Sequence, residues 1–153
     1  MELIILTGAI NSGKTTILQT WILAHENAHG ILSPKENNVR HFFDIYSNEK
    51  FNMLANDSDT DKIFVGKYSF SKTAFDKAEN IIIDAAKNNY STIVIDEIGP
   101  LELKEEGFST ALTYCLKNCK KQIIIVVRES LVEAVIEKFS LKRYVPKILH
   151  KLE

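Results

Sequence analysis

The feature that most constrains the fold of this chain is a glycine-flanked loop close to its amino terminus. An apolar run, residues 3–7, leads directly into Gly8-x4-Gly13-Lys14-Thr15. This spacing is the phosphate-binding P-loop pattern, in which a buried strand is followed by a loop of backbone N–H groups and then by the amino terminus of a helix. The pattern therefore predicts a strand, a loop that can hold an anionic phosphate chain, and a helix that begins at residue 14.

Each residue type in this loop suits the chemistry of phosphate binding. Gly8 lets the chain turn away from the strand, and Gly13 lets the backbone approach the phosphates without a Cβ atom between them. Lys14 reaches the β- and γ-phosphate oxygens as a point charge, and Thr15 offers its hydroxyl to Mg²⁺. Thr16 is placed for a further phosphate contact. The predicted nucleotide-binding residues of the loop are Gly8, Ala9, Ile10, Asn11, Ser12, Gly13, Lys14, Thr15 and Thr16.

Length, composition and charge limit the other possibilities. The 153 residues, 45% of them hydrophobic, predict one domain over residues 1–153 with a substantial core. A net charge of −1 gives no global field that would attract nucleic acid or an anionic membrane surface. No apolar run approaches the ~18 residues of a membrane span, and no basic leader precedes the first strand. We therefore expect a cytoplasmic protein without a nucleic-acid or membrane partner, and the sequence does not identify a protein partner.

Strand-like and helix-like patterns alternate along the rest of the chain. Residues 92–95 are apolar and end in two acids, and residues 122–127 form a second such run. Uninterrupted apolar strands are typical of a parallel sheet that helices cover on both faces. The predicted fold class is therefore a three-layer α/β structure, mainly parallel, with right-handed crossovers. Helical spacing places the covering helices from residue 14 to Gly30 and around residues 75–85, 108–116 and 131–139, with a short helix in the tail over residues 143–153.

A β-hairpin is expected as an insertion in this sheet. Residues 31–33 and 39–46 have extended patterns on either side of a turn at residues 34–38. Aromatic side chains occur on both faces of the second segment, which indicates that the hairpin packs against other structure. Residues 62–65 predict another short strand, after which Ser69 or Ser71 caps the next helix.

The two acids that follow residues 92–95 are expected to complete the phosphate site. Asp96 is predicted to hold Mg²⁺, directly or through a water, opposite the hydroxyl of Thr15. Glu97 is predicted to lie on the γ-phosphate side and to polarise an attacking water as a general base, which typically contributes ~10²–10⁴ in rate. The predicted catalytic residues are therefore Lys14, Asp96 and Glu97, and the predicted metal ligands are Thr15 and Asp96.

Few arginines are available to neutralise further charge. Arg128 follows residues 122–127 and is expected at the edge of the sheet where ligands of open α/β folds collect, close to the γ-phosphate. An arginine in that place can supply ~10³–10⁵ in rate. Arg40 and the pair Lys67-Tyr68 are further candidates for contacts with the phosphates or the base.

Several motifs together resemble the small THEP-type nucleoside-triphosphatase family. They are the P-loop, Phe43-Asp44-Ile45, Val65-Gly66-Lys67-Tyr68 and, most specifically, the segment from Val94 to Glu102, in order between residues 3 and 128. The resemblance implies an ATPase- or RecA-related P-loop fold that hydrolyses several nucleoside triphosphates, ATP and GTP among them, slowly. It also implies that residues 96–103 lie at the nucleotide, which adds Ile98 and Gly99 to the predicted binding set. Asn11 stands where the family often has Gly, and Asn tolerates a positive φ better than most residues.

Other P-loop functions are kept as alternatives. A small-molecule or nucleotide kinase needs a site for an acceptor and often carries an arginine-rich lid, whereas only three arginines are scattered along this chain. A GTPase switch would need a guanine-reading Asn-Lys-x-Asp segment, which the sequence lacks. A nucleotide-dependent binding module without catalysis would have no use for Glu97.

Three further patterns imitate metal or redox sites. His25-Glu26-x-x-His29 matches the zinc-protease motif, with Glu49 as a possible third ligand, but it falls at the predicted end of a helix. The run Asp57-x-Asp59-x-Asp61 begins like a calcium loop, yet Lys62 stands where the turn glycine belongs. Cys115 and Cys119 are expected to be free, partly buried thiols.

Overall fold

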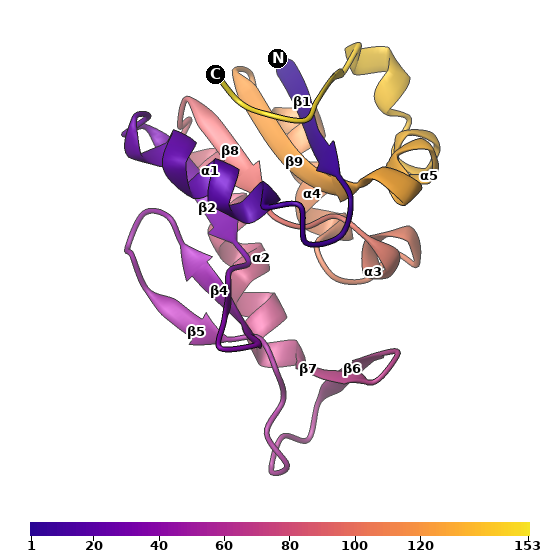
Figure 1. Ribbon diagram of the computed structural model, residues 1–153. Coiled ribbons are helices and arrows are strands. Elements are labelled where there is room, and N and C mark those ends of the chain that lie inside the picture. Colours follow the sequence, from indigo (N-terminus) through magenta and orange to yellow (C-terminus); the bar gives the residue numbers. More distant parts are fainter.

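The fold is a mainly parallel β-sheet with helices on both faces, and the computed structural model describes residues 1–153 (Figure 1). Eight strands form the sheet in the order β10-β1-β9-β8-β2-β4-β3, with β5 paired to β4. The five strands from β10 to β2 run parallel, and β4 is antiparallel to β2, β3 and β5. The predicted three-layer α/β fold is confirmed.

The elements alternate along the chain as the periodicity predicts. The strands are β1 (Glu2–Gly8), β2 (Ala28–Leu32), β3 (Lys35–Glu36), β4 (Val39–Asp44), β5 (Lys50–Asn52), β6 (Lys62–Val65), β7 (Tyr68–Ser71), β8 (Thr92–Ile95), β9 (Gln122–Arg128) and β10 (Lys147–Leu149). The helices are α1 (Lys14–Leu23), α2 (Lys72–Lys87), α3 (Pro100–Leu103), α4 (Ser109–Asn118) and α5 (Val132–Lys138), with 3₁₀ turns η1 (Glu129–Leu131) and η2 (Leu141–Tyr144). None of these helices combines the length and the apolar character needed to cross a membrane.

Alternate residues of the central strands supply two separate cores. On one face, Leu3 and Ile5 of β1 join a cluster of 27 buried residues together with α2, α4 and α5. On the other face, Ile4 and Leu6 join a smaller cluster of eight, which α1 covers through the fully buried Leu18. The central strands are therefore apolar on both sides because both sides face helices.

Two hairpins extend the molecule beyond the parallel sheet. The predicted one is confirmed, since β2 pairs antiparallel with β4 and the short β3 folds back on β4 through a turn at Asn37 and Asn38. The second consists of β6 and β7, and it projects away from the sheet below α3 in Figure 1. Sequence reasoning found only the first strand of this second hairpin and missed β7, which begins at Tyr68 and ends at the helix-capping Ser71.

Gly30 does not end a helix, so that prediction was wrong. Helix α1 already stops at Leu23, and Gly30 lies in the middle of β2, paired in register with Val94 of β8. Its φ is +128°, a conformation that side chains with a Cβ rarely adopt, and a Cβ there would collide with the carbonyl oxygen of Val94. The glycine is needed because β2 and β8 approach each other closely at this position.

The tail is not a helix either. After the short η2 turn, residues 147–149 form β10, which runs parallel to β1 with Ile4 opposite Lys147. Pro146 explains the difference, because it lacks an N–H for a helix and disfavours helical backbone at Val145 before it. As Figure 1 shows, the tail instead lies along β1 at the edge of the sheet, where it pairs backbone groups that would otherwise be unpaired.

Candidate active site

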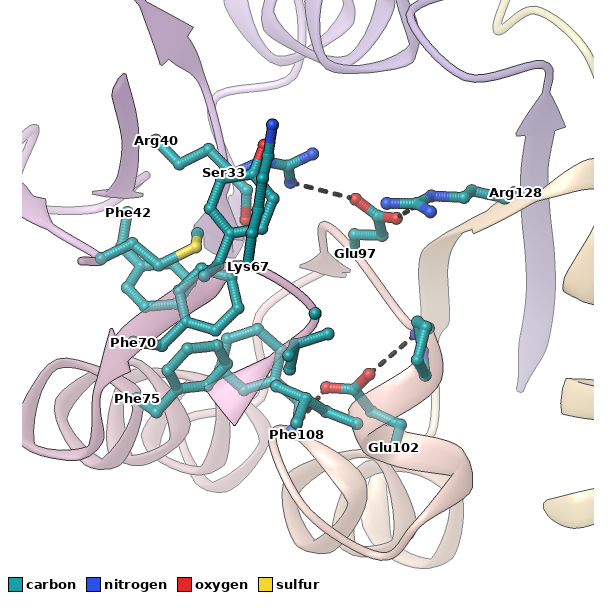
Figure 2. Close-up of a pocket in the computed structure, with 17 residues that line it drawn as sticks. Ser33, Arg40, Phe42, Lys67, Phe70, Phe75, Glu97, Glu102, Phe108 and Arg128 are labelled. Carbon is teal, nitrogen blue, oxygen red and sulfur yellow. Dashed lines mark hydrogen bonds and ion pairs between the residues drawn. The ribbon is translucent and has the colours of Figure 1, made fainter. Parts of the chain in front are cut away.

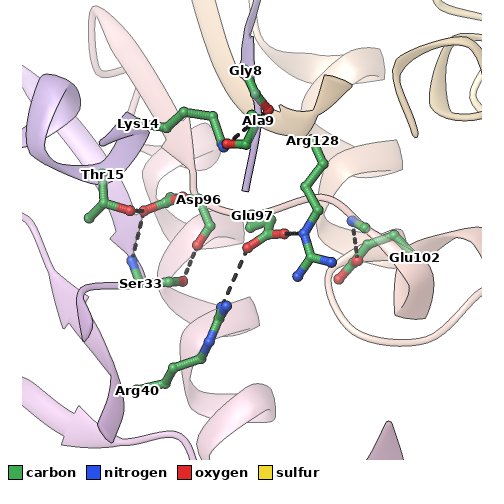
Figure 3. A network of polar contacts seen from close by, with 11 residues as sticks. Gly8, Ala9, Lys14, Thr15, Ser33, Arg40, Asp96, Glu97, Glu102 and Arg128 are labelled. Carbon is green, nitrogen blue, oxygen red and sulfur yellow. Dashed lines mark hydrogen bonds and ion pairs between the residues drawn. The ribbon is translucent and has the colours of Figure 1, made fainter. Parts of the chain in front are cut away.

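The loop between β1 and α1 has the backbone geometry of a phosphate cradle (Figure 3). A Cβ on Gly8 would lie 2.6 Å from the Oγ atom of Ser12, so the Ser12 hydroxyl would have to move to admit a side chain there. Gly13 precedes α1 with a φ of +82°, and Asn11 has a φ of +59°. Asn11 thus adopts the left-handed conformation that was expected of it, and the loop forms without a glycine at that position.

The Lys14 side chain folds back over the loop. Its Nζ atom donates to the carbonyl oxygen of Ala9 at 2.7 Å and to that of Gly8 at 3.3 Å. The ammonium group is also 3.3 Å from the hydroxyl of Ser12. These contacts place a positive charge over the concave side of the loop, where anionic phosphate oxygens would compete for it.

Asp96 links the end of β8 to the start of α1 through the hydroxyl of Thr15. Its Oδ2 atom accepts a hydrogen bond from the hydroxyl of Thr15 at 2.8 Å and from the backbone N–H of Ser33 at 3.0 Å. The Ser33 hydroxyl in turn donates to the Asp96 carbonyl oxygen. Strands β1 and β8 both pair with β9 in parallel, so their carboxyl ends reach the same edge of the sheet. Two segments about eighty positions apart in the sequence therefore meet in one site.

The surroundings of Asp96 suit a bound cation. The residue is 2% exposed, and this burial raises the pKa of the carboxyl to about 6, although the hydrogen bonds from Ser33 and Thr15 act in the opposite direction. A cation beside the carboxylate would favour its ionised form. The hydroxyl of Thr15 and the carboxylate oxygen are both hard ligands of the kind that Mg²⁺ prefers, so the donor set fits the predicted metal.

Glu97 lies between two arginines that come from opposite sides of the site. Its Oε1 atom accepts from Nε of Arg128 at 2.9 Å, and its Oε2 atom accepts from Nη1 of Arg40 at 3.4 Å. Arg128 is the last residue of β9, and Arg40 belongs to β4 in the hairpin. Two of the three arginines that look scattered in the sequence therefore meet at one carboxylate, as Figure 3 shows.

A cavity of about 280 Å³ lies over the loop and joins these groups. The predicted residues that line it are Ile10, Asn11, Ser12, Gly13, Lys14, Thr15, Thr16, Asp96, Glu97 and Arg128. Gln19, Ser33, Lys35, Arg40 and Val126 line it as well. We refer to this space as the phosphate pocket. Gly8 and Ala9 contribute the carbonyl groups that hold Lys14.

Ile98 and Gly99 do not line the phosphate pocket. The side chain of Ile98 is fully buried in the larger core, and its N–H donates to the carbonyl oxygen of Val126. Gly99 instead lines a neighbouring cavity. The segment that begins at Asp96 thus reaches the phosphate pocket through Asp96 and Glu97 alone, and the residues that follow fix its path.

Sequence reasoning missed Gln19, Ser33 and Lys35, which line the phosphate pocket, and the role of Glu102 beside it. Ser33 follows β2 directly, and the pairing of β2 with β8 could have placed it beside Asp96 had the strand order been known. Glu102 is 3% exposed and accepts hydrogen bonds from the N–H groups of Gly99 at 2.8 Å and Phe108 at 2.9 Å. Its burial raises the pKa of the carboxyl to about 7. Glu102 therefore ties together the two ends of the segment that carries α3.

The zinc-protease motif does not form a metal site. His25 follows the end of α1, where its ring stacks on Trp21 at 3.7 Å and its Nδ1 atom lies 2.7 Å from the Trp21 carbonyl oxygen. His29 is buried in β2 against Tyr46 and Tyr90. The two histidines therefore belong to different elements rather than to one turn of helix. No group of three or more His, Cys, Asp or Glu side chains in the structure is arranged to hold a metal ion.

The acidic run at residues 57–61 and the two cysteines also have simple structural roles. The N–H of Asn56 donates to Asp59 at 2.6 Å, which makes the acidic run a hydrogen-bonded turn. Cys115 and Cys119 are free, as predicted, and burial raises the pKa of the Cys115 thiol to about 12. Cys115 therefore serves as an apolar side chain of the core.

Comparison with known proteins identifies the family. The model of a family described as NTPase matches residues 3–149 of the chain. The chain belongs to this NTPase family. A curated relative, the nucleoside-triphosphatase THEP1 of Pyrococcus abyssi, is 36% identical over 69 residues. That match spans 45% of this chain and 38% of the relative, so the chain aligns with less than half of that protein's length. The resemblance to the THEP-type family is confirmed.

Two solved structures share the fold of this chain. The crystal structure of THEP1 from Aquifex aeolicus has a TM-score of 0.75 and 20% sequence identity, covering 97% of this chain and 88% of that one. The solution structure of a human cancer-related nucleoside triphosphatase has a TM-score of 0.73 and 18% identity, covering 100% of this chain and 89% of that one. Both matches therefore extend over nearly the whole chain.

Proposed function

We propose that this protein hydrolyses nucleoside triphosphates to the diphosphate and phosphate with Mg²⁺ as cofactor. One observation carries the proposal: the P-loop and the acids after β8 meet in a single pocket, through the 2.8 Å hydrogen bond between Thr15 and Asp96. The family and its curated nucleoside-triphosphatase relative support the same chemistry.

Each residue of the phosphate pocket has its own role in this proposal. Backbone N–H groups of the loop and the charge of Lys14 bind the phosphates, and Thr15 and Asp96 hold the metal. When bound, Mg²⁺ neutralises charge that develops on the phosphate oxygens. Glu97 orients a water in line with the γ-phosphate and accepts its proton as the water oxygen attacks phosphorus. Loss of Lys14, Asp96 or Glu97 is therefore expected to abolish or strongly slow turnover.

The two arginines support a low intrinsic rate. Arg128 and Arg40 are both engaged with Glu97, so each would have to leave or share this carboxylate before it could contact the γ-phosphate. An arginine that is free to neutralise transition-state charge can supply ~10³–10⁵ in rate. We infer that the arginines here serve first to position Glu97, and that hydrolysis without an activator is slow.

The substrate range, location and organisation are proposed more broadly. The proposed contacts of the phosphate pocket are with the phosphates and their bound metal. All nucleoside triphosphates have the same phosphate chain, so we propose that ATP, GTP, CTP and UTP are all substrates. These compounds and Mg²⁺ are abundant in the cytoplasm, which we propose as the location. One sheet with a core on each face supports the proposal that residues 1–153 act as a single domain.

Replacing the proposed base tests this function most directly. Glu97→Gln keeps the size of the side chain but cannot accept a proton, so we expect phosphate release from ATP and GTP to fall at least ~10²-fold while nucleotide affinity is kept. Glu49→Gln, which changes an exposed glutamate paired with Lys77, is the matched control and should hydrolyse at the normal rate. Equal rates in all three proteins would show that Glu97 is not the base. Binding without turnover in the unaltered protein would favour a non-catalytic module.

A further inference from the structure

A second cavity, of about 380 Å³, lies beyond Glu97 on the side away from the P-loop (Figure 2). Aromatic side chains form most of its apolar wall, namely Phe42, Tyr68, Phe70, Phe75 and Phe108. The β6–β7 hairpin contributes one side, and the segment from Gly99 to Glu102 contributes another. We refer to this space as the aromatic pocket. The hydrolysis proposed above assigns a role only to residues at its polar end.

The aromatic pocket and the phosphate pocket share a wall. Ser33, Arg40, Glu97 and Arg128 line both cavities. In Figure 2 the Arg40–Glu97–Arg128 ion pairs cross the space at the polar end of the aromatic pocket, above the aromatic rings. Glu97, the proposed proton acceptor, is therefore within reach of ligands on either side. A compound in the aromatic pocket would present its polar end to the position of the attacking water.

The lining defines the chemical class of the ligand. A volume of about 380 Å³ is typical of small-molecule sites and leaves no room for a folded partner. Several aromatic faces favour a flat apolar ring, since rings pack against each other in stacked or edge-to-face arrangements. Glu102 offers little to a ligand because its carboxylate already accepts from Gly99 and Phe108. The remaining polar groups gather at the other end of the pocket, namely Ser33, Arg40, Lys67, Glu97 and Arg128. Glu97 is paired with both arginines there, but its side chain is 22% exposed and each of its oxygens can accept a second hydrogen bond, so a donor such as a hydroxyl fits beside it.

We propose that the aromatic pocket binds a small alcohol with a flat apolar ring, and that its hydroxyl accepts the γ-phosphoryl group. The hydroxyl oxygen forms a new bond to the γ-phosphorus while the bond from that phosphorus to the β–γ bridging oxygen breaks. The hydroxyl proton passes to Glu97 and from there to solvent, and the products are a phosphate monoester and a nucleoside diphosphate. The transfer step rests on the proposed triphosphate chemistry, whereas binding of the alcohol does not.

Binding is tested without any nucleotide, with 2-phenylethanol as the probe and saturation-transfer NMR as the measurement. We expect saturation of its phenyl protons by the unaltered protein. Val65→Trp places a large side chain in the aromatic pocket and should abolish the signal. Phe64→Trp is the matched control, because Phe64 is the neighbouring residue of β6, points to the opposite face and is 73% exposed. It should keep the signal.

Two results would overturn the binding site. One is the absence of a signal from the unaltered protein at millimolar probe, and the other is an equal signal from Val65→Trp. Thermal unfolding of both tryptophan variants shows whether Val65→Trp is folded. If it is not, Tyr68→Ala, which removes an exposed wall of the same pocket, should weaken probe binding at least several-fold.

Transfer is tested by adding ATP and Mg²⁺ and recording ³¹P spectra. With 2-phenylethanol we expect a phosphate monoester signal, and ADP in excess of free phosphate. Ethylbenzene, which has the ring without the hydroxyl, should give free phosphate alone. Probe binding together with free phosphate as the only product would overturn the transfer while leaving hydrolysis intact. No turnover with or without the probe would instead refute the proposed hydrolysis, and the nucleotide-free binding result would still stand.

Discussion

At the candidate active site, the Glu97 side chain is paired with side chains from two different strands. Arg128 makes the shorter contact, 2.9 Å, and Arg40 the longer one, 3.4 Å. The sequence predicted that Arg128 and Glu97 share one edge of the sheet, but it gave no reason to expect that they bind each other. Partners separated by thirty-one positions can be recognised only once the neighbouring strands are known.

Removing the shorter contact should slow hydrolysis without weakening nucleotide binding. Arg128→Ala leaves Glu97 held by Arg40 alone, so the carboxylate can leave the line of attack, and we expect kcat to fall by about tenfold or more. The affinity for ADP, which has no γ-phosphate, should be unchanged. Arg143→Ala changes the remaining arginine, which lies beside Tyr144 away from the site, and is the control. A normal kcat in Arg128→Ala would show that this ion pair does not position the base.

At the scale of elements, the sequence predicted what a short window of residues determines. The strands over 92–95 and 122–127, the helix capped by Ser71 and the P-loop were all found, because burial on both faces, capping and phosphate binding each leave a local pattern. The end of α1 and the strand β10 were not found. Gly30 has its unusual backbone because of a neighbouring strand, and β10 forms because β1 offers it an edge.

Gly30 therefore provides a test of how closely the strands pack. Gly30→Ala forces a Cβ against the Val94 carbonyl at a φ of +128°, so we expect the free energy of unfolding to fall by roughly 2 kcal/mol or more. Gly66→Ala is a matched control, because Gly66 also has a positive φ, +56°, but no atom lies within 4 Å of its Cβ position. It should cost only about 1 kcal/mol. Urea denaturation measures both, and equal losses would mean that contact with β8 adds nothing.

At the scale of the whole molecule, the folded protein buries two carboxyl groups close to the candidate site, those of Asp96 and Glu102. Burial raises the pKa of Asp96 from 3.8 to about 6 and that of Glu102 from 4.5 to about 7. Both groups hold a proton in the folded state at pH values where the unfolded chain has released it. The free energy of unfolding should therefore fall as the pH rises through this window, to about 6 for Asp96 and about 7 for Glu102. His29 acts in the opposite direction, because burial lowers its pKa below 6.5.

A difference between two proteins isolates the contribution of Glu102 from these opposing effects. Glu102→Gln keeps one oxygen that can accept from Gly99 or Phe108, so the variant loses one hydrogen bond. Because glutamine does not ionise, the contribution of residue 102 to the free energy of unfolding no longer depends on pH. The unaltered protein should lose stability relative to the variant between about pH 4.5 and pH 7, by on the order of 3 kcal/mol in total. Urea denaturation at several pH values, with a chelator present to keep cations from Asp96, gives this difference. A difference that stays constant from pH 5 to pH 8 would show that Glu102 ionises as readily in the folded protein as in the unfolded chain.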